Sequence, residues 1–162
     1  ALKELKIGDF AEIFIPSNLA RGEKGIEGLI PANADNILKI RILDVVAPTR
    51  ETDGNKVWLL EENTTNIEGF NEDNEIEFHC MVSTPSNPLY VNTFRLNNPF
   101  KLRFEDRGTV PGLKKSLINA KKSDRFFVLV PAAEGYGARG YHNVVKPNED
   151  LFYNILVMNV TE

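Results

Sequence analysis

Cysteine and histidine are scarce in this chain of 162 residues, which contains one cysteine, Cys80, and two histidines, His79 and His142. A lone cysteine excludes a disulfide within the chain, and so few sulfur and nitrogen ligands argue against a zinc site. Basic residues are fewer than acidic ones: the chain has 19 Lys and Arg and 23 Asp and Glu, which gives a net charge of −4. Nucleic-acid-binding domains favour a basic patch, so no nucleic-acid partner is expected. We expect neither a metal nor another cofactor.

Long apolar runs are missing as well. No stretch approaches the ~20 apolar residues that a membrane-spanning helix needs, so no membrane span is expected. No signal peptide is recognisable at Ala1, but the start without Met suggests a processed or trimmed chain, which leaves a bacterial cell-envelope and a cytoplasmic location open. Apolar residues make up 42% of the chain and charged residues 26%, which is typical of a globular protein with one domain or one and a half.

A pattern of about forty residues occurs twice in the chain. The first copy runs from Ile7 to Val46 and the second from Lys122 to Val160, at a constant shift of 115 positions and without a gap. The shift aligns turn residues as well as strand residues: Asp9 with Asp124, Pro16 with Pro131, Gly22 with Gly137, Gly25 with Gly140, Asn33 with Asn148, Asp35 with Asp150 and Ile40 with Ile155. Such self-similarity predicts a structural unit that occurs twice.

Alternating apolar and polar residues predict the strands of both copies. In the first copy, strands are expected at 10–15 and 37–43, joined by a long loop rich in Gly, Pro and Asn. Further strands are expected at 57–62, 75–82, 100–104, 125–130 and 151–160. A helix is predicted over 111–122, because Pro111 suits its first position and an apolar face follows at helical spacing. One short helix among antiparallel strands predicts an α+β fold.

The stretch 47–55 divides the chain in this interpretation. It carries Pro48, Gly54 and several charges, and it is predicted to be a linker. Residues 1–46 then form a partial unit and residues 56–162 a complete domain.

Four segments of the second unit form a set: PFKLRF at 99–104, VPGLKKSL at 110–117, VPAAEGYGARG at 130–140 and VVKPNEDLFYNILVMNV at 144–160. Together they resemble the FKBP-type peptidyl-prolyl cis-trans isomerases, the receptors of macrolides such as tacrolimus. The resemblance covers about residues 56–162. It implies a twisted antiparallel β-sheet wrapped around one short α-helix, with an apolar basin between them. Residues 1–46 resemble only the C-terminal half of such a domain.

The resemblance implies an isomerase that acts on X-Pro bonds during protein folding. Rotation about a peptide bond has a barrier of ~18–20 kcal/mol. No bond breaks, so an apolar cavity with one or two hydrogen-bond donors can suffice. The implied catalytic groups are the backbone N–H of Val110 and the hydroxyl of Tyr136. The implied substrate-binding residues are Tyr90, Phe100, Leu113, Val145 and Tyr153. Proline-containing polypeptides are the implied partners, together with macrolides such as tacrolimus.

Some positions of the second unit depart from the family pattern. Val91 stands where the family has a basin aspartate, although Asn92 is adjacent and a one-residue slip would bring an amide there. Cys80 replaces a tyrosine of an early strand, and Leu113 replaces the tryptophan of the basin floor. These departures keep a second hypothesis open, a non-catalytic binding or chaperone module that retains the apolar basin. A purely structural repeat is a third.

The first copy departs further. Arg21 occupies the position of the loop tyrosine, and Leu38 occupies that of the aromatic residue on the last strand, so no catalytic role is expected for it. A half-domain of this size buries too little surface to fold alone. Its missing half is expected either ahead of Ala1 or on another chain. Alternatively, the first copy packs as a degenerate appendage on the complete domain.

Overall fold

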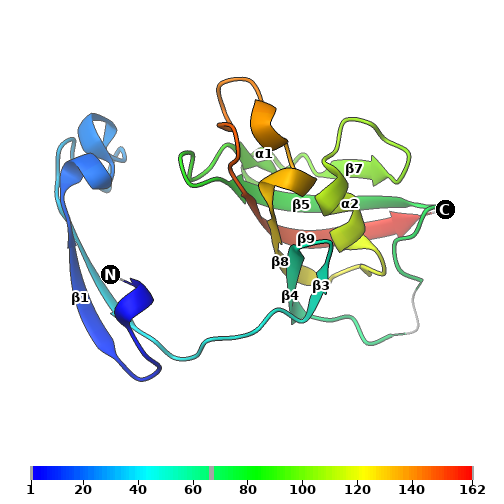
Figure 1. Ribbon diagram of the computed structural model, residues 1–162, viewed down its shortest axis with the longest axis horizontal. Coiled ribbons are helices and arrows are strands. Elements are labelled where there is room, and N and C mark those ends of the chain that lie inside the picture. Colours follow the sequence, from blue (N-terminus) through cyan, green and yellow to red (C-terminus); the bar gives the residue numbers. More distant parts are fainter. Residues whose placement is uncertain (1, 66–67, 162) are drawn as a thin grey trace. The chain divides into compact units, whose positions relative to one another are not determined.

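The computed structural model describes residues 2–65 and 68–161, and the chain divides into two units, Ala1–Val46 and Ala47–Glu162 (Figure 1). The second unit contains an antiparallel sheet with the strand order β3-β4-β8-β9-β5-β6, and β7 pairs with β5 beside this path. Its strands are β3 (Arg50–Thr52), β4 (Asn55–Glu61), β5 (Glu75–Ser83), β6 (Val91–Asn92), β7 (Phe100–Arg103), β8 (Arg125–Val130) and β9 (Leu151–Thr161). Within the described residues, no helix is both long and apolar enough to cross a membrane.

The helix α2 (Pro111–Leu117) contacts β4 and β8 on one side of this sheet (Figure 1). A second helix, α1 (Thr93–Leu96), forms a single turn after β6. Two 3-10 turns, η4 (Ala132–Glu134) and η5 (Gly137–Arg139), lie in the loop between β8 and β9. A short helix on an antiparallel sheet confirms the predicted α+β class.

The core of the second unit fills the space between α2 and the sheet. Residues 126, 128 and 130 alternate on β8 and are buried, as are residues 151, 153 and 155 on β9. Leu113 and Leu117 bury the apolar face of α2 against them. Every second side chain of β8 and β9 therefore points into the core, as the alternation of apolar residues in the sequence predicts.

The structure corrects the expected linker. Arg50–Thr52 forms β3 and pairs with residues 55–57 of β4, and the second unit begins at Ala47. The connecting residues Asp53 and Gly54 both have positive φ, 52° and 80°, which is typical of a tight hairpin turn. The guanidinium of Arg50 donates to the carbonyl of Ile118 at 2.8 Å, which ties this hairpin to the chain after α2.

Helix α2 is shorter than the sequence predicts. It ends at Leu117, because Ile118 has an extended backbone with ψ of 133° and Asn119 has a left-handed φ of 65°. Asn119 and Ala120 then exchange backbone hydrogen bonds with Phe70. These bonds replace further helical turns and tie the chain after α2 to the segment between β4 and β5.

The first unit is a β-hairpin. Strands β1 (Phe10–Ile15) and β2 (Asn36–Arg41) pair with each other in an antiparallel register. The 3-10 turns η1 (Leu2–Glu4), η2 (Ser17–Leu19) and η3 (Gly22–Lys24) precede β1 or lie in the connecting loop. None of residues 2–46 is buried, so this unit has no core of its own within that range.

Candidate functional site

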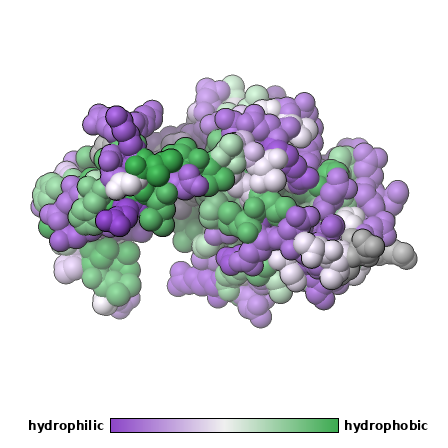
Figure 2. Space-filling view, turned by 90° about the horizontal axis from the view of Figure 1, so that it is seen from below, coloured by the Kyte–Doolittle hydropathy of each residue, from purple (hydrophilic) through white to green (hydrophobic). Residues whose placement is uncertain are grey.

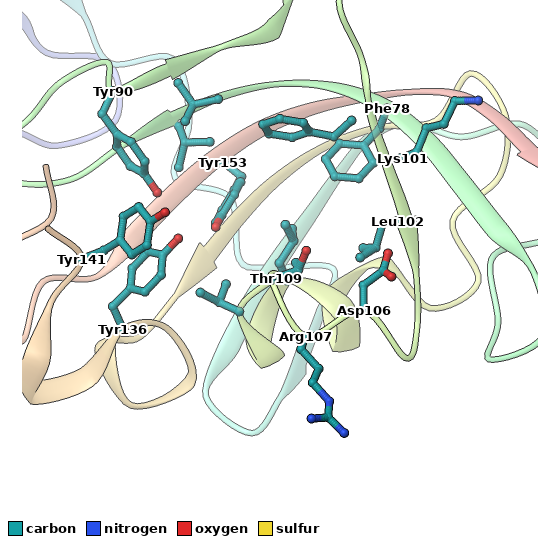
Figure 3. Close-up of a pocket in the computed structure, with 16 residues that line it drawn as sticks. Phe78, Tyr90, Lys101, Leu102, Asp106, Arg107, Thr109, Tyr136, Tyr141 and Tyr153 are labelled. Atoms are coloured by element: carbon teal, nitrogen blue, oxygen red, sulfur yellow. The ribbon is translucent and has the colours of Figure 1, made fainter.

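An apolar hollow of about 500 Å³ lies between the sheet of the second unit and the start of α2 (Figure 3). Val110 and Leu113 form its floor, and Tyr153 on β9 lies beside them. Six of the seven residues implied by the resemblance line this hollow: Tyr90, Phe100, Val110, Leu113, Tyr136 and Tyr153. The fold thus brings together side chains that are up to 63 positions apart in the sequence, from Tyr90 to Tyr153.

Val145, the seventh implied residue, does not line the hollow. It is buried, and its carbonyl accepts a hydrogen bond from the backbone N–H of Tyr141 at 2.9 Å. Gly140 approaches this carbonyl so closely that a Cβ at position 140 would overlap with it, and Gly140 also has a φ of 64°. Val145 therefore supports the loop that presents Tyr136 and Tyr141.

The floor of the hollow depends on how α2 begins. Val110 precedes the helix with a φ of −61° and a ψ of 139°, and Pro111 takes the first helical position. Val110 is 6% exposed and Leu113 is 4% exposed, so most of each side chain packs against the core. Within residues 2–65 and 68–161, the backbone N–H of Val110 donates to no protein acceptor. It is available to a bound carbonyl group.

Four tyrosines form one wall, and Figure 3 shows the hydroxyls of Tyr90, Tyr136, Tyr141 and Tyr153 pointing into a common space. The rings of Tyr136 and Tyr141 stack at a centroid distance of 4.6 Å and an interplanar angle of 21°. Burial raises the pKa of Tyr90, of Tyr136 and, most strongly, of Tyr153 above its usual range. These three phenols therefore stay protonated at neutral pH and can act as hydrogen-bond donors.

The opposite wall comes from β7 and the loop after it. Phe100 contacts Phe78 edge to face, with ring centroids 6.1 Å apart. The loop residues 106–109 line the hollow beyond them, and the carboxylate of Asp106 accepts from the backbone N–H of Arg103 at 2.8 Å. The ammonium of Lys114 on α2 donates to the carbonyl of Phe104 at 2.8 Å, which holds this loop against the helix.

The positions that depart from the family pattern have distinct places. Val91 lines the hollow, whereas the side chain of Asn92 caps α1 by accepting from the backbone N–H of Arg95 at 3.2 Å. Cys80 does not line the hollow; it lies in the core under β6 and α1, and burial raises the pKa of its thiol to about 12. Of these two neighbouring residues, only the apolar Val91 lines the hollow.

Sequence reasoning missed Tyr141 and the loop 106–109. Tyr141 directly follows the glycine turn that contains Tyr136, so a second aromatic residue in that turn was an available signal. The loop 106–109 carries charges and one glycine and has no apolar periodicity. It lies beside the hollow because it connects β7 to α2, which both contribute residues to the hollow. No cluster of three or more metal-ligating side chains occurs in the part of the chain that the structure describes.

A short helix on a twisted antiparallel sheet, with an aromatic-lined hollow between them, defines an FKBP-like domain. The chain belongs to the FKBP-type peptidyl-prolyl cis-trans isomerase family, whose family model matches residues 68–158. The resemblance seen in the sequence is thereby confirmed for the second unit. Residues 1–46 lie outside this match.

Individual relatives are distant. The mouse peptidyl-prolyl cis-trans isomerase FKBP10 is 18% identical over 154 residues, which cover 95% of this chain and 26% of the relative. Human FKBP9 is 25% identical over 85 residues, which cover 52% of this chain and 15% of the relative. The chain thus spans about a quarter or less of the length of these relatives.

Solved structures share the fold. The N-terminal domain of FKBP42 from Arabidopsis thaliana has a TM-score of 0.62 at 20% identity, with 72% of this chain and 98% of that chain covered. FkpA from Escherichia coli has a TM-score of 0.59 at 19% identity, with 67% and 48% covered.

Proposed function

We propose that the second unit catalyses the cis–trans isomerisation of X-Pro bonds in unfolded or partly folded polypeptides. The observation that carries this proposal is the hollow itself, in which an apolar floor lies beside the backbone N–H of Val110, which has no acceptor among the described residues. Membership of the family supports the same activity.

The chemistry follows from the properties of the peptide bond. The planar amide is held by resonance that separates charge between oxygen and nitrogen, and the twisted amide has lost this resonance. An apolar hollow that excludes water favours the less charge-separated, twisted form. The prolyl ring packs on Leu113 and Tyr153, and the Val110 N–H binds a substrate carbonyl and fixes its orientation. The hydroxyl of Tyr136 donates to a second carbonyl.

The test is a protease-coupled or NMR-exchange proline assay, run beside a titration with tacrolimus. Isomerisation that tacrolimus inhibits supports the enzyme. Tacrolimus binding without isomerisation supports the second candidate, a non-catalytic binding or chaperone module, which the apolar Val91 in the hollow favours. Absence of both activities contradicts the proposed site.

Removing the hydroxyl of Tyr136 is expected to weaken substrate binding. In Tyr136→Phe, kcat/KM should fall about tenfold, because one hydrogen bond to a bound carbonyl contributes roughly 1–1.5 kcal/mol. The melting temperature should stay within the error of the parent protein, since Tyr136 is only half-buried at the rim. Tyr136→Ala should also leave the fold intact, and global unfolding of that variant would mean that Tyr136 is a core residue and that the site is misplaced.

Introducing a carboxylate into the hollow is expected to raise activity. Val91→Asp restores the acid of the family pattern beside the phenol wall, where it can accept a charge-assisted hydrogen bond from a hydroxyl and orient it. We expect kcat/KM to rise about fivefold. The matched control is Asn92→Asp, which adds the same charge one position along, where the side chain caps α1. Equal rates in the two variants would argue against the gapless alignment.

A further inference from the structure

All four tyrosines of the chain line the hollow: Tyr90, Tyr136, Tyr141 and Tyr153. Hydrophilic residues are spread over the face of the second unit that Figure 2 shows. Among the residues that line the hollow, by contrast, only Lys101, Asp106 and Arg107 carry a charge, and Thr109 is the one other residue with a polar side chain apart from the tyrosines. Phenol hydroxyls therefore supply most of the uncharged hydrogen-bonding groups of this lining.

The four hydroxyls have few partners of their own. Those of Tyr136 and Tyr153 both hydrogen-bond with that of Tyr90. Within residues 2–65 and 68–161, none of the four hydroxyls has a further hydrogen-bond partner. A phenol hydroxyl has one proton to donate, so these two bonds use two of the four protons. Two donors are left for a ligand: one belongs to the three linked hydroxyls, and the other is the hydroxyl of Tyr141.

Tyr141 is held firmly at the rim of the hollow. Its backbone N–H donates to the carbonyl of Val145 at 2.9 Å, and its own carbonyl accepts from the N–H groups of Val144 and Val145, both at 3.1 Å. Its ring stacks on that of Tyr136, and the ring of His142 contacts it edge to face at a centroid distance of 4.4 Å. The hydroxyls of the stacked pair therefore point the same way, as Figure 3 shows.

The loop that carries Tyr141 has the same backbone in both units. At the shift of 115 positions, the turns η2 and η3 have the same bounds as η4 and η5. Asp35 accepts from the backbone N–H of Ser17 at 2.8 Å, and its counterpart Asp150 accepts from that of Ala132 at 2.9 Å. The first loop therefore shows which features of the second loop the shared turns require.

Position 141 corresponds to Ile26 in the first loop. The backbone N–H of Ile26 donates to the carbonyl of Ile30 at 2.7 Å, and its carbonyl accepts from the N–H groups of Leu29 and Ile30 at 3.0 Å and 2.8 Å. Tyr141 makes the same three bonds in the second loop. The turn forms without a phenol, so the shape of the loop does not account for the hydroxyl of Tyr141.

The place of this hydroxyl beside Tyr136 indicates what it can bind. In the proposed function, on which this role rests, the hydroxyl of Tyr136 donates to a substrate carbonyl. The residue before the proline carries the carbonyl of the bond that rotates, and its side chain starts from the neighbouring carbon atom. A second donor next to Tyr136 therefore faces the side chain of that residue.

We propose that Tyr141 is a specificity-determining residue, whose hydroxyl binds the side-chain carboxylate of a glutamate that precedes the proline in the substrate. A hydrogen bond to a carboxylate is roughly twice as strong as one to a neutral acceptor. Tyr141 is 43% exposed, so a carboxylate bound there keeps part of its hydration. The one acid of the lining, Asp106, lies on the opposite wall, where its carboxylate accepts from the N–H of Arg103.

The net charge of the chain makes the expected preference specific. With a net charge of −4, the long-range field of the chain disfavours anionic peptides. A preference for glutamate over glutamine must therefore come from local hydrogen-bond donors.

Three peptides test this role with the 162-residue chain. The first has glutamate before the proline, the second has glutamine there, and the third has glutamine there and a glutamate further upstream. In NMR-exchange measurements, we expect kcat/KM of the first peptide to exceed that of the second about fivefold, because its acceptor is charged. The third peptide should behave like the second. Equal values for the first and third peptides would mean that the net charge of the peptide, and not Tyr141, sets the preference.

Variants assign the preference to one hydroxyl. In Tyr141→Phe the ring remains and the hydroxyl is lost, so the ratio of the first two peptides should fall to within about twofold of unity. Tyr141→Ile, which introduces the residue of the first loop, should give the same ratio. Tyr136→Phe is the matched control: it removes the donor to a carbonyl that both peptides share, so both values should fall while their ratio stays at about five. An unchanged ratio in Tyr141→Phe would overturn the role of Tyr141.

Binding is measured separately from turnover. Because every tyrosine of the chain lines the hollow, protein labelled with carbon-13 in its tyrosine rings gives NMR signals from this site alone. The signal that disappears in Tyr141→Phe belongs to Tyr141, and the glutamate peptide should shift it at an about fivefold lower concentration than the glutamine peptide. Turnover of both peptides with equal affinities would contradict the role of Tyr141 but not the isomerase. Tighter binding of the glutamate peptide without turnover would contradict the isomerase alone.

Discussion

Raising the pH from 9 to 11 is expected to lower the free energy of unfolding of the second unit by about 3–4 kcal/mol. The reason is that Cys80 is fully buried and Tyr153 is 5% exposed, and burial raises the pKa of both groups in the folded state. The unfolded chain releases these protons near their ordinary pKa values, whereas the folded chain keeps them. Stability is therefore complete below about pH 9 and falls as the pH rises toward 12, the folded pKa of Cys80.

The size of this loss of stability follows from the one proton that each group releases when the chain unfolds. Each group that only the unfolded state has ionised removes about 1.4 kcal/mol per pH unit. Urea unfolding, followed by far-ultraviolet circular dichroism at several pH values, measures the slope. Tyr153→Phe and Cys80→Ala should each make the slope shallower, and the double variant should keep only the shallower slope that Tyr90 and Tyr136 contribute, because burial raises the pKa of both these phenols too. An unchanged slope in the double variant would contradict the assignment to these two groups.

Replacing Val110 by proline is expected to lower kcat/KM about 100-fold. Val110→Pro deletes the backbone N–H that is proposed to bind a substrate carbonyl. The backbone tolerates the change, because the φ of −61° is the value that a proline ring imposes and the ψ of 139° suits a residue before Pro111. One oriented donor is worth about 10²–10³ in sites where full charge develops, so the lower end applies here.

The control for this prediction is Val110→Ala, which keeps the N–H and shortens the side chain. It should lose less than about tenfold in kcat/KM, and both variants should bind tacrolimus more weakly than the parent protein. Equal activity of the two variants would exclude the backbone N–H of Val110 from catalysis. Circular dichroism and the melting temperature show whether the proline variant is folded, so that an effect on catalysis is separated from an effect on stability.

Much of the fold is visible in the sequence because strand alternation and the repeat are local signals. The periods of β8 and β9 predict which side chains are buried, and the shift of 115 positions predicts the loop that both units share. Strand β3 was missed because it consists only of the polar residues Arg50–Thr52, although Asp53-Gly54 is a strong turn signal. The length of α2 was overestimated because left-handed Asn119, and not the apolar period, decides where the chain turns.

The candidate site was predicted from family motifs. The prediction therefore left out lining residues that lie outside those motifs. Tyr136 and Val110 both line the hollow, and each lies next to a glycine or a proline that restricts the backbone there. Val145 does not line the hollow, because its side chain is buried in the core while its backbone carbonyl accepts from the N–H of Tyr141. The lining by residues 106–109 depends on packing between β7 and α2, which has no local sequence signal.

The loop that joins the two strands of each hairpin has the same backbone turns in both units but carries different side chains. Glycines at 22 and 25, and at 137 and 140, have positive φ in both loops, while the position directly before the first glycine of each pair has diverged, with Arg21 in one unit and Tyr136 in the other. Because the glycines and the capping aspartates determine the shape, the intervening residues are free to drift without cost to folding. Duplication of such a loop can therefore change the side chains that it presents while its backbone keeps the same turns.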